Sequence, residues 1–184
     1  MKKTIILSVL LSSALLCNEL TLKEVLETGD KLSKELLTQL STRLTHEIKT
    51  NGLLQAAKFC NNNALTLTEE VNLHQIQGVN VKRISLKQRN SANAPKADEA
   101  AVLESLQKML EKKTLPEYVI AEEGKTYKYY KPLVIKKQAC LRCHGDMSKN
   151  PELNAFILEV YPQDKARGYK MGDLRGAVLV EIRP

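Results

Sequence analysis

Apolar residues recur at steps of three and four along the first half of the chain, and this spacing predicts helices. One apolar stripe covers residues 22–51, and Asn51-Gly52 ends it as a helix C-cap would. A shorter helix with small residues on one side is predicted over residues 53–64, and another over residues 97–113. The long stripe consists of Leu22, Val25, Leu26, Leu32, Leu36, Leu40, Leu44 and Ile48.

The second half of the chain has the shorter apolar runs that are typical of strands. The predicted strands span residues 79–86, 118–121, 125–134, 156–160 and 177–182. Asn, Ser, Gly and Pro mark loops at residues 89–95 and 162–176, and residues 136–151 are polar and contain two cysteines. Helices followed by mostly antiparallel strands, with one helix between them, indicate the α+β class.

The first 17 residues have the pattern of an export signal. Two lysines precede an apolar run from Ile5 to Leu16, and the polar pair Asn18-Glu19 follows it too early for a membrane-spanning helix. We therefore expect residues 1–17 to be a signal peptide, residues 18–184 to form one domain, and the protein to be periplasmic. Cleavage could follow Ala14 or Cys17; lipid anchoring at Cys17 is the alternative, although the preceding leucine is bulky.

Composition and charge restrict the class of protein without identifying a partner. The chain has 184 residues, of which 43% are hydrophobic and 27% charged, and this balance excludes a disordered chain or a multi-pass membrane protein. The net charge of +7 falls once the two signal lysines are removed, and the remaining basic clusters are short. We expect no nucleic-acid partner and no further membrane span. The long first helix either packs across the domain or pairs with a second copy in a homodimer.

The sequence Cys140-Leu141-Arg142-Cys143-His144 is the C-x-x-C-H signature of covalent haem attachment. The two thiols would bond the two vinyl groups of haem c, and His144 would be an axial iron ligand. Three other interpretations are a redox disulfide, a zinc site and a structural disulfide. The first expects a thioredoxin-like setting, the second lacks a nearby second pair of ligands, and the third leaves His144 without a role.

The second axial ligand has several candidates. They are Cys60, His46, His74, Met109, Met147 and Met171. Met147 follows His144 too closely to reach the opposite side of the haem. Cys60 would be an unpaired thiol in an exported protein, on a helix whose small residues would allow it to lie against a flat ring. A free, buried cysteine without a ligand role is the simpler alternative.

Several further motifs resemble a family of periplasmic c-type haem sensor domains with a PAS-like fold. The matching segments are Ala57-Lys58-Phe59-Cys60, Arg83-Ile84-Ser85, Arg89-Asn90, Asn93-Ala94-Pro95, Tyr130-Lys131-Pro132-Leu133, Cys140 to Gly145, Tyr161-Pro162, Asp164-Lys165-Ala166, Gly168-Tyr169 and Gly172 to Gly176. Ser91 departs from the family pattern, which usually has proline there.

The resemblance implies a PAS-like antiparallel sheet with a long N-terminal helix, one haem bound at Cys140 and Cys143, and His144 and Cys60 as axial ligands. Many members of the family are sensor parts of larger signalling proteins. That role does not transfer automatically to this chain. Our leading hypothesis is a redox or gas sensor in which an electron, or a small ligand that displaces Cys60, changes the ligation. The alternatives are a periplasmic electron carrier with fixed ligation and a haem-free zinc or thiol protein. No acid–base pair or nucleophile indicates an enzyme. Arg83 and Arg89 could neutralise haem propionates or have structural roles.

Overall fold

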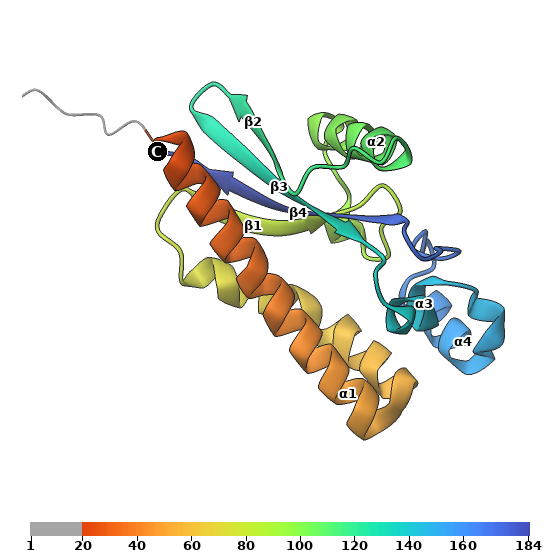
Figure 1. The fold of residues 1–184 in the computed structure, drawn as a ribbon. Coiled ribbons are helices and arrows are strands. Elements are labelled where there is room, and N and C mark those ends of the chain that lie inside the picture. The colour runs from red at the N-terminus through yellow and green to blue at the C-terminus, as the bar shows by residue number, and fades with distance from the viewer. Residues whose placement is uncertain (1–19) are drawn as a thin grey trace, which may run out of the picture.

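The computed structural model describes residues 20–184. The predicted export signal in residues 1–17, with Cys17, lies outside the described residues. Along the chain the elements are α1 (Leu22–Leu73), β1 (Val79–Ile84), η1 (Ser91–Asn93), α2 (Ala97–Glu111), β2 (Val119–Glu123), β3 (Thr126–Val134), α3 (Gln138–His144), η2 (Met147–Lys149), α4 (Pro151–Val160) and β4 (Leu174–Ile182). Figure 1 shows their arrangement.

Within residues 20–184, no helix combines the length and the apolar character that crossing a membrane requires.

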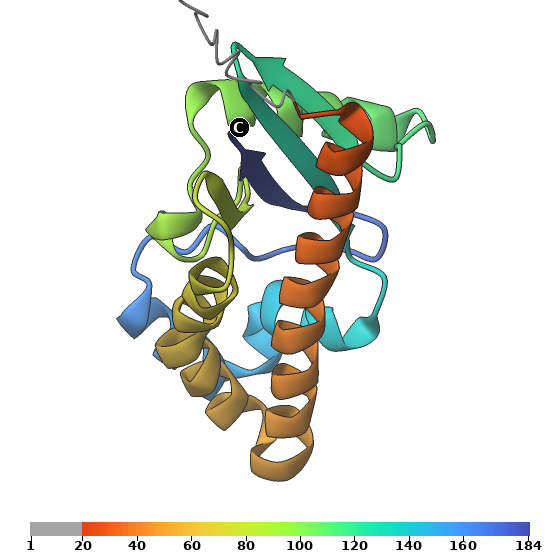
Figure 2. The same ribbon diagram turned by 90° about the vertical axis from the view of Figure 1, so that its left-hand side faces the viewer.

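α1 is a helical hairpin that turns back on itself at Gly52 (Figure 2). Gly52 has φ 81° and ψ 178°, a conformation that is essentially confined to glycine. The first arm, residues 22–51, ends where the sequence predicts. The second arm, residues 53–73, runs past the predicted end at residue 64, because Leu67 and Val71 continue the apolar spacing and are both buried.

The four strands form one antiparallel sheet in the order β1-β4-β3-β2. β4 lies between β1 and β3, and nearly every residue in it is buried. Strands that are covered on both faces are apolar at successive positions rather than at alternate ones. The run from Ala177 to Val180 follows this rule. The antiparallel sheet with a long N-terminal helix and flanking helices confirms the predicted α+β class.

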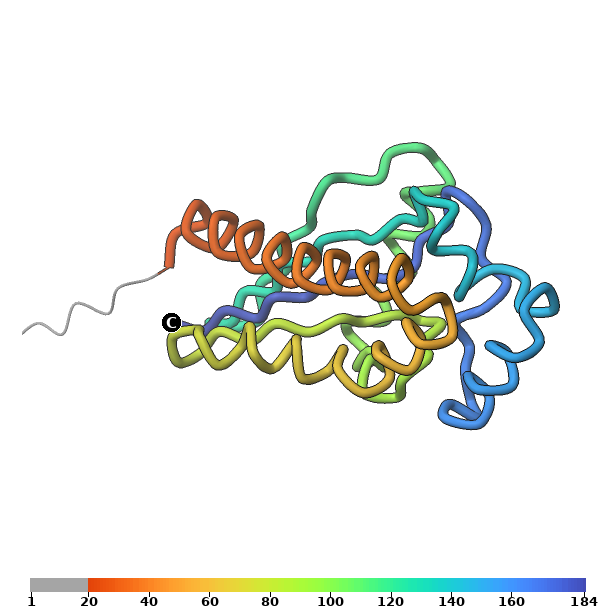
Figure 3. The backbone as a smooth tube through the Cα atoms, turned by 90° about the horizontal axis from the view of Figure 1, so that it is seen from below, coloured from red at the N-terminus to blue at the C-terminus, as the bar shows by residue number. Residues whose placement is uncertain are grey.

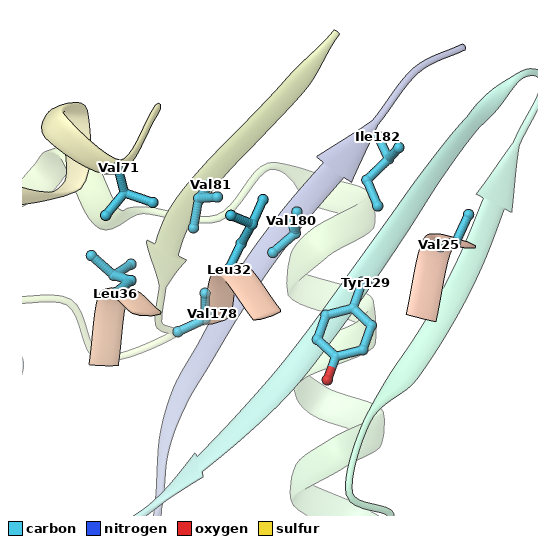
Figure 4. Close-up of a cluster of buried hydrophobic side chains, with 9 residues drawn as sticks. All are labelled: Val25, Leu32, Leu36, Val71, Val81, Tyr129, Val178, Val180 and Ile182. Carbon is cyan, nitrogen blue, oxygen red and sulfur yellow. The ribbon is translucent and has the colours of Figure 1, made fainter. Parts of the chain in front are cut away.

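Helices cover both faces of the sheet. The first arm of α1 lies across one face, where Val25, Leu32 and Leu36 share an apolar cluster with Tyr129 of β3 and with alternate residues of β4 (Figure 4). α2 lies on the other face through Leu103 and Leu106. Val25, Leu32 and Leu36 of the apolar stripe are therefore packed within their own chain, whereas Leu22 at its start is exposed. Dimerisation through this helix stays a prediction.

The tip of the α1 hairpin extends beyond the sheet, where α3 and α4 lie beside it (Figures 2 and 3). Residues 156–160 were predicted as a strand, and this is wrong: they form the second half of α4. Pro151 is at the first helical position, where its missing N–H has no helical partner to lose. Leu153 and Ile157, four residues apart, are buried against the hairpin tip.

Candidate functional site

α3 places the two motif thiols and the histidine on a single short helix. Cys140 and Cys143 are three residues apart, so they lie on the same side of α3, and both are partly buried. Cys140 packs against Ile135, Ala166 and Tyr169, whereas Cys143 packs toward η2 and α4. Neither thiol forms a disulfide bond.

The imidazole of His144 is held in one orientation. Its Nδ1 lies 2.9 Å from the carbonyl oxygen of Ala166, which can only accept, so Nδ1 carries the hydrogen and Nε2 keeps its lone pair. Burial, assisted by the positive charges of Arg175 and Arg89, lowers the pKa of His144 to about 3. The ring is therefore neutral at pH 7, and its Nε2 keeps a lone pair of the kind that binds a metal.

A second contact fixes the plane of this imidazole. The ring of Tyr169 meets it nearly at right angles, with centroids 6.2 Å apart. The backbone N–H of Tyr169 also donates to the carbonyl of His144 at 2.9 Å. The segment after α4 is thus attached to the end of α3 through both side chain and backbone.

A buried ion pair holds that segment in place. Arg89 donates through Nε to Asp164 at 3.1 Å and through Nη2 to the carbonyls of Cys143 at 2.6 Å and Ala166 at 3.1 Å. The Asp164 side chain is fully buried and also accepts from the guanidinium of Arg167. Arg89 thereby connects the end of α3 to the residue whose carbonyl orients His144.

Cys60 lies on the second arm of α1 and is partly buried. Ala57, one turn earlier, packs into the same apolar cluster as Cys143. Burial raises the pKa of the Cys60 thiol, and the neighbouring Cys143 raises it further, while Arg83 and Arg89 act in the opposite direction. The fold therefore places Cys60 within electrostatic reach of Cys143, although the two are far apart in sequence.

The other candidate ligands are not brought together at this site. His46 and His74 are exposed on α1 and at its C-cap, and Met109 is exposed on α2, across the sheet. Met171 is also exposed, and Met147 is buried in η2 on the same side as Cys143. Within residues 20–184, no three His, Cys, Asp or Glu side chains are grouped to hold a metal ion by themselves.

One buried polar atom near Cys60 lacks a partner. The Nε of Arg83 is buried and has no hydrogen-bond partner among the described residues, while its Nη2 donates to the carbonyl of Ala64 at 3.1 Å. An unpaired buried donor is costly unless a ligand satisfies it. Two thiols, an oriented imidazole, a third thiol and an unpaired guanidinium are donors that suit an iron porphyrin with acidic side chains.

Sequence reasoning missed the roles of Asp164, Tyr169 and Arg175. All three lie in the segments that carry the family resemblance. The resemblance indicates that they are important but does not show what they do. Arg175 Nη1 donates to the hydroxyl of Ser85 at 2.9 Å, and its guanidinium lies 5.5 Å from the centre of the Tyr169 ring. These pairings join residues that are distant in sequence, so only the fold reveals them.

Comparisons with known proteins cover almost the whole chain. A family profile described as Tll0287-like matches residues 16–183. Among solved structures, the chain is similar to one described as the crystal structure of the cyanobacterial heme-protein Tll0287, with 25% sequence identity and a TM-score of 0.63. That match covers 88% of this chain and 94% of the other. No curated protein matches the chain.

Proposed function

The chain belongs to the Tll0287-like family, and we propose that it is an exported, periplasmic protein that carries one covalently bound haem c. Its similarity to a cyanobacterial heme-protein supports haem binding. The observation that carries the proposal is the arrangement of α3, which holds two thiols that form no disulfide and an imidazole whose Nδ1 is bonded to the Ala166 carbonyl.

Cys140 and Cys143 are the proposed attachment points. Each thiol would add across one vinyl group: sulfur bonds one vinyl carbon, the thiol hydrogen passes to the other, and the carbon–carbon double bond becomes single. No electrons enter or leave in this addition. The spacing of two residues between the cysteines suits the two vinyl groups of one haem.

His144 and Cys60 are the proposed axial ligands. The Ala166 carbonyl keeps the hydrogen of His144 on Nδ1, which leaves Nε2 for iron. Cys60, on the second arm of α1, would supply the second ligand, and thiolate ligation would lower the reduction potential of the haem. When bound, haem supplies an iron centre that exchanges one electron and accepts small axial ligands.

A sensing role is the function that we favour, because both proposed ligands are joined to β1. The second arm, which carries Cys60, is joined to β1 through Asn72. The side-chain amide of Asn72 accepts from the backbone N–H of Val81 at 2.6 Å and donates to the carbonyl of Val81 at 2.9 Å. The ring of His144 contacts the ring of Tyr169. The guanidinium of Arg175 lies near the Tyr169 ring and donates to the hydroxyl of Ser85, just after β1. A shift of either ligand would therefore move the same strand. We propose that this movement, rather than an enzymatic reaction, is passed to a periplasmic partner.

Optical spectra and haem staining test the cofactor. Protein produced in a host that matures c-type cytochromes should keep haem on a denaturing gel, and the Cys140→Ser/Cys143→Ser variant should lose it. Cys60→Ala should keep the attached haem but change the absorption spectrum in at least one redox state. A wild-type chain without haem would refute the proposal, and an unchanged Cys60→Ala spectrum would remove Cys60 as a ligand.

Titration with carbon monoxide or nitric oxide separates a gas sensor from the alternative of an electron carrier with fixed ligation. A gas sensor should show ligand exchange in the wild-type spectrum. A redox sensor should instead show a change of hydrogen exchange in β1 between oxidised and reduced protein. A wild-type protein that shows neither effect would support the electron carrier.

A further inference from the structure

The sequence offers Arg83 and Arg89 equally as partners of a haem carboxylate, but their surroundings in the fold differ. Arg89 is charge-compensated: Asp164 accepts from it, and its Nη2 donates to two backbone carbonyls. Arg83 forms no ion pair with any residue from 20 to 184, and its one hydrogen bond is to the Ala64 carbonyl. The fold therefore leaves Arg83 with a positive charge that lacks a counter-charge.

The surroundings of Arg83 make this charge costly. Its Nε is inaccessible to solvent and lacks an acceptor among the described residues. Burial lowers the pKa of Arg83, and the nearby positive charge of Arg175 lowers it further. Arg83 is partly buried as a residue, and a cation in such a place without a partner is costly. Such a group is expected where a ligand brings the missing negative charge.

We infer that Arg83 binds a carboxylate of the haem, whereas Arg89 is a structural residue that orients the His144 loop. This inference rests on the proposed function. Haem carries two propionate carboxylates, and a guanidinium matches their planar geometry with paired N–H donors. The positive charge of Arg83 acts on Cys60 and favours its thiolate, but the Nε of Arg83 makes no hydrogen bond to that sulfur. The acceptor that completes Arg83 is therefore absent from the described residues.

The thermal stability of haem-bearing and haem-free protein tests the assignment. Arg83→Gln should lower the melting temperature of the haem-bearing protein by about 2–4 °C, because it leaves a carboxylate without its partner. In the Cys140→Ser/Cys143→Ser background the same substitution should leave the melting temperature unchanged or raise it, because it removes an uncompensated charge. Arg89→Gln, the matched control, should lower both values.

Resonance Raman spectra add a readout that a purely structural role would not move. The carboxylate bending band of the haem should shift in Arg83→Gln, return toward its wild-type position in Arg83→Lys, and remain unshifted in Arg89→Gln. These effects should persist when Cys60 is replaced by Ala. If they vanish in that background, Arg83 is instead the charge partner of Cys60 and the carboxylate assignment is overturned.

The outcomes separate the two proposals. Equal destabilisation of both forms by Arg83→Gln, or an unshifted Raman band, overturns the role of Arg83 while the protein still carries haem. A wild-type chain that carries no haem overturns the proposed function and the carboxylate pairing with it. Mass spectrometry of the denatured protein decides between these cases before any variant is compared.

Discussion

At the scale of single residues, Asp164 holds several other groups of the site in place. Its fully buried carboxylate accepts from Arg89 and Arg167 and from the backbone N–H of Ala166. Asp164→Ala would leave Arg89 buried without a counter-charge. We expect a loss of about 3–5 kcal/mol in the free energy of unfolding, measured by urea denaturation.

Asp146→Ala is the matched control for this prediction. Asp146 is exposed and accepts only from the nearby Ser148 in η2. Its removal should change the free energy of unfolding far less than Asp164→Ala does. Similar losses in the two variants would contradict the structural role of the buried pair.

Gly29 is a second residue whose identity the packing determines. A Cβ at this position would overlap the ring of Tyr129, which lies fully buried in the sheet. From the sequence alone Gly29 only weakens a helix, and Gly→Ala in a helix usually stabilises it. Here we expect Gly29→Ala to destabilise the protein by about 1–3 kcal/mol in urea denaturation. Lys31→Ala, exposed on the same arm, should be nearly neutral, and a stabilised Gly29→Ala would contradict the close packing.

The separation along the chain between interacting residues explains which parts of the site were predictable. Cys140, Cys143 and His144 are neighbours in sequence, so their spacing alone indicates the chemistry. Arg89 and Asp164 are 75 residues apart, and their pairing depends on how the loop after α4 returns to α3. Arg83 and Arg89 could not be ranked before the fold showed that only one of them has a carboxylate partner.

At the scale of elements, predictions succeeded where the apolar period was long. The first arm of α1, the four strands of the sheet and α2 lie close to their predicted ranges. The prediction for residues 156–160 failed because a short, mostly apolar run fits a strand or one side of a helix equally well. Leu153 and Ile157 favour the helix because they pack against the hairpin tip. The local sequence pattern does not reveal this contact.

α2 is tied to the sheet by a charged group that makes stability depend on pH. Lys128 of β3 is mostly buried and donates to Asp98 in the first turn of α2 at 2.6 Å and to Glu123 of β2. The hydrogen bond from Lys128 lowers the pKa of Asp98. This contribution to stability is therefore present above about pH 4, the unfolded pKa of an aspartate, and is lost as the pH falls through the lower folded pKa.

Asp98→Asn should accordingly reduce the melting temperature at pH 7 by about 1–4 °C, a small effect because Asp98 is partly exposed to solvent. The difference from wild type should narrow as the pH falls from 5 toward 3. Glu104→Gln, an exposed position on α2 without an ion pair in residues 20–184, should show no such trend. A difference that stays constant across this range would contradict the ion pair.

At the scale of the whole molecule, the sheet and the haem site are packed by different clusters of side chains. Two large apolar clusters join the sheet to α1 and α2, and neither contains a residue of α3 or α4. Two small clusters hold α3, η2 and α4 against the loops and the hairpin tip, and they include both Cys140 and Cys143. The stability of the sheet should therefore depend little on haem, whereas that of the site should depend on it strongly.

Hydrogen exchange of the Cys140→Ser/Cys143→Ser variant tests this division. Without covalent haem, amides of α3, α4 and the hairpin tip should exchange markedly faster than in the haem-bearing protein, because few buried apolar contacts hold them. Amides of β3, β4 and the start of α1 should keep most of their protection. Arg83 lies on β1, within the part expected to stay folded, so its unpaired charge should persist in the haem-free protein. Equal loss of protection across the sheet and the site would show instead that the chain folds only as one unit around its cofactor.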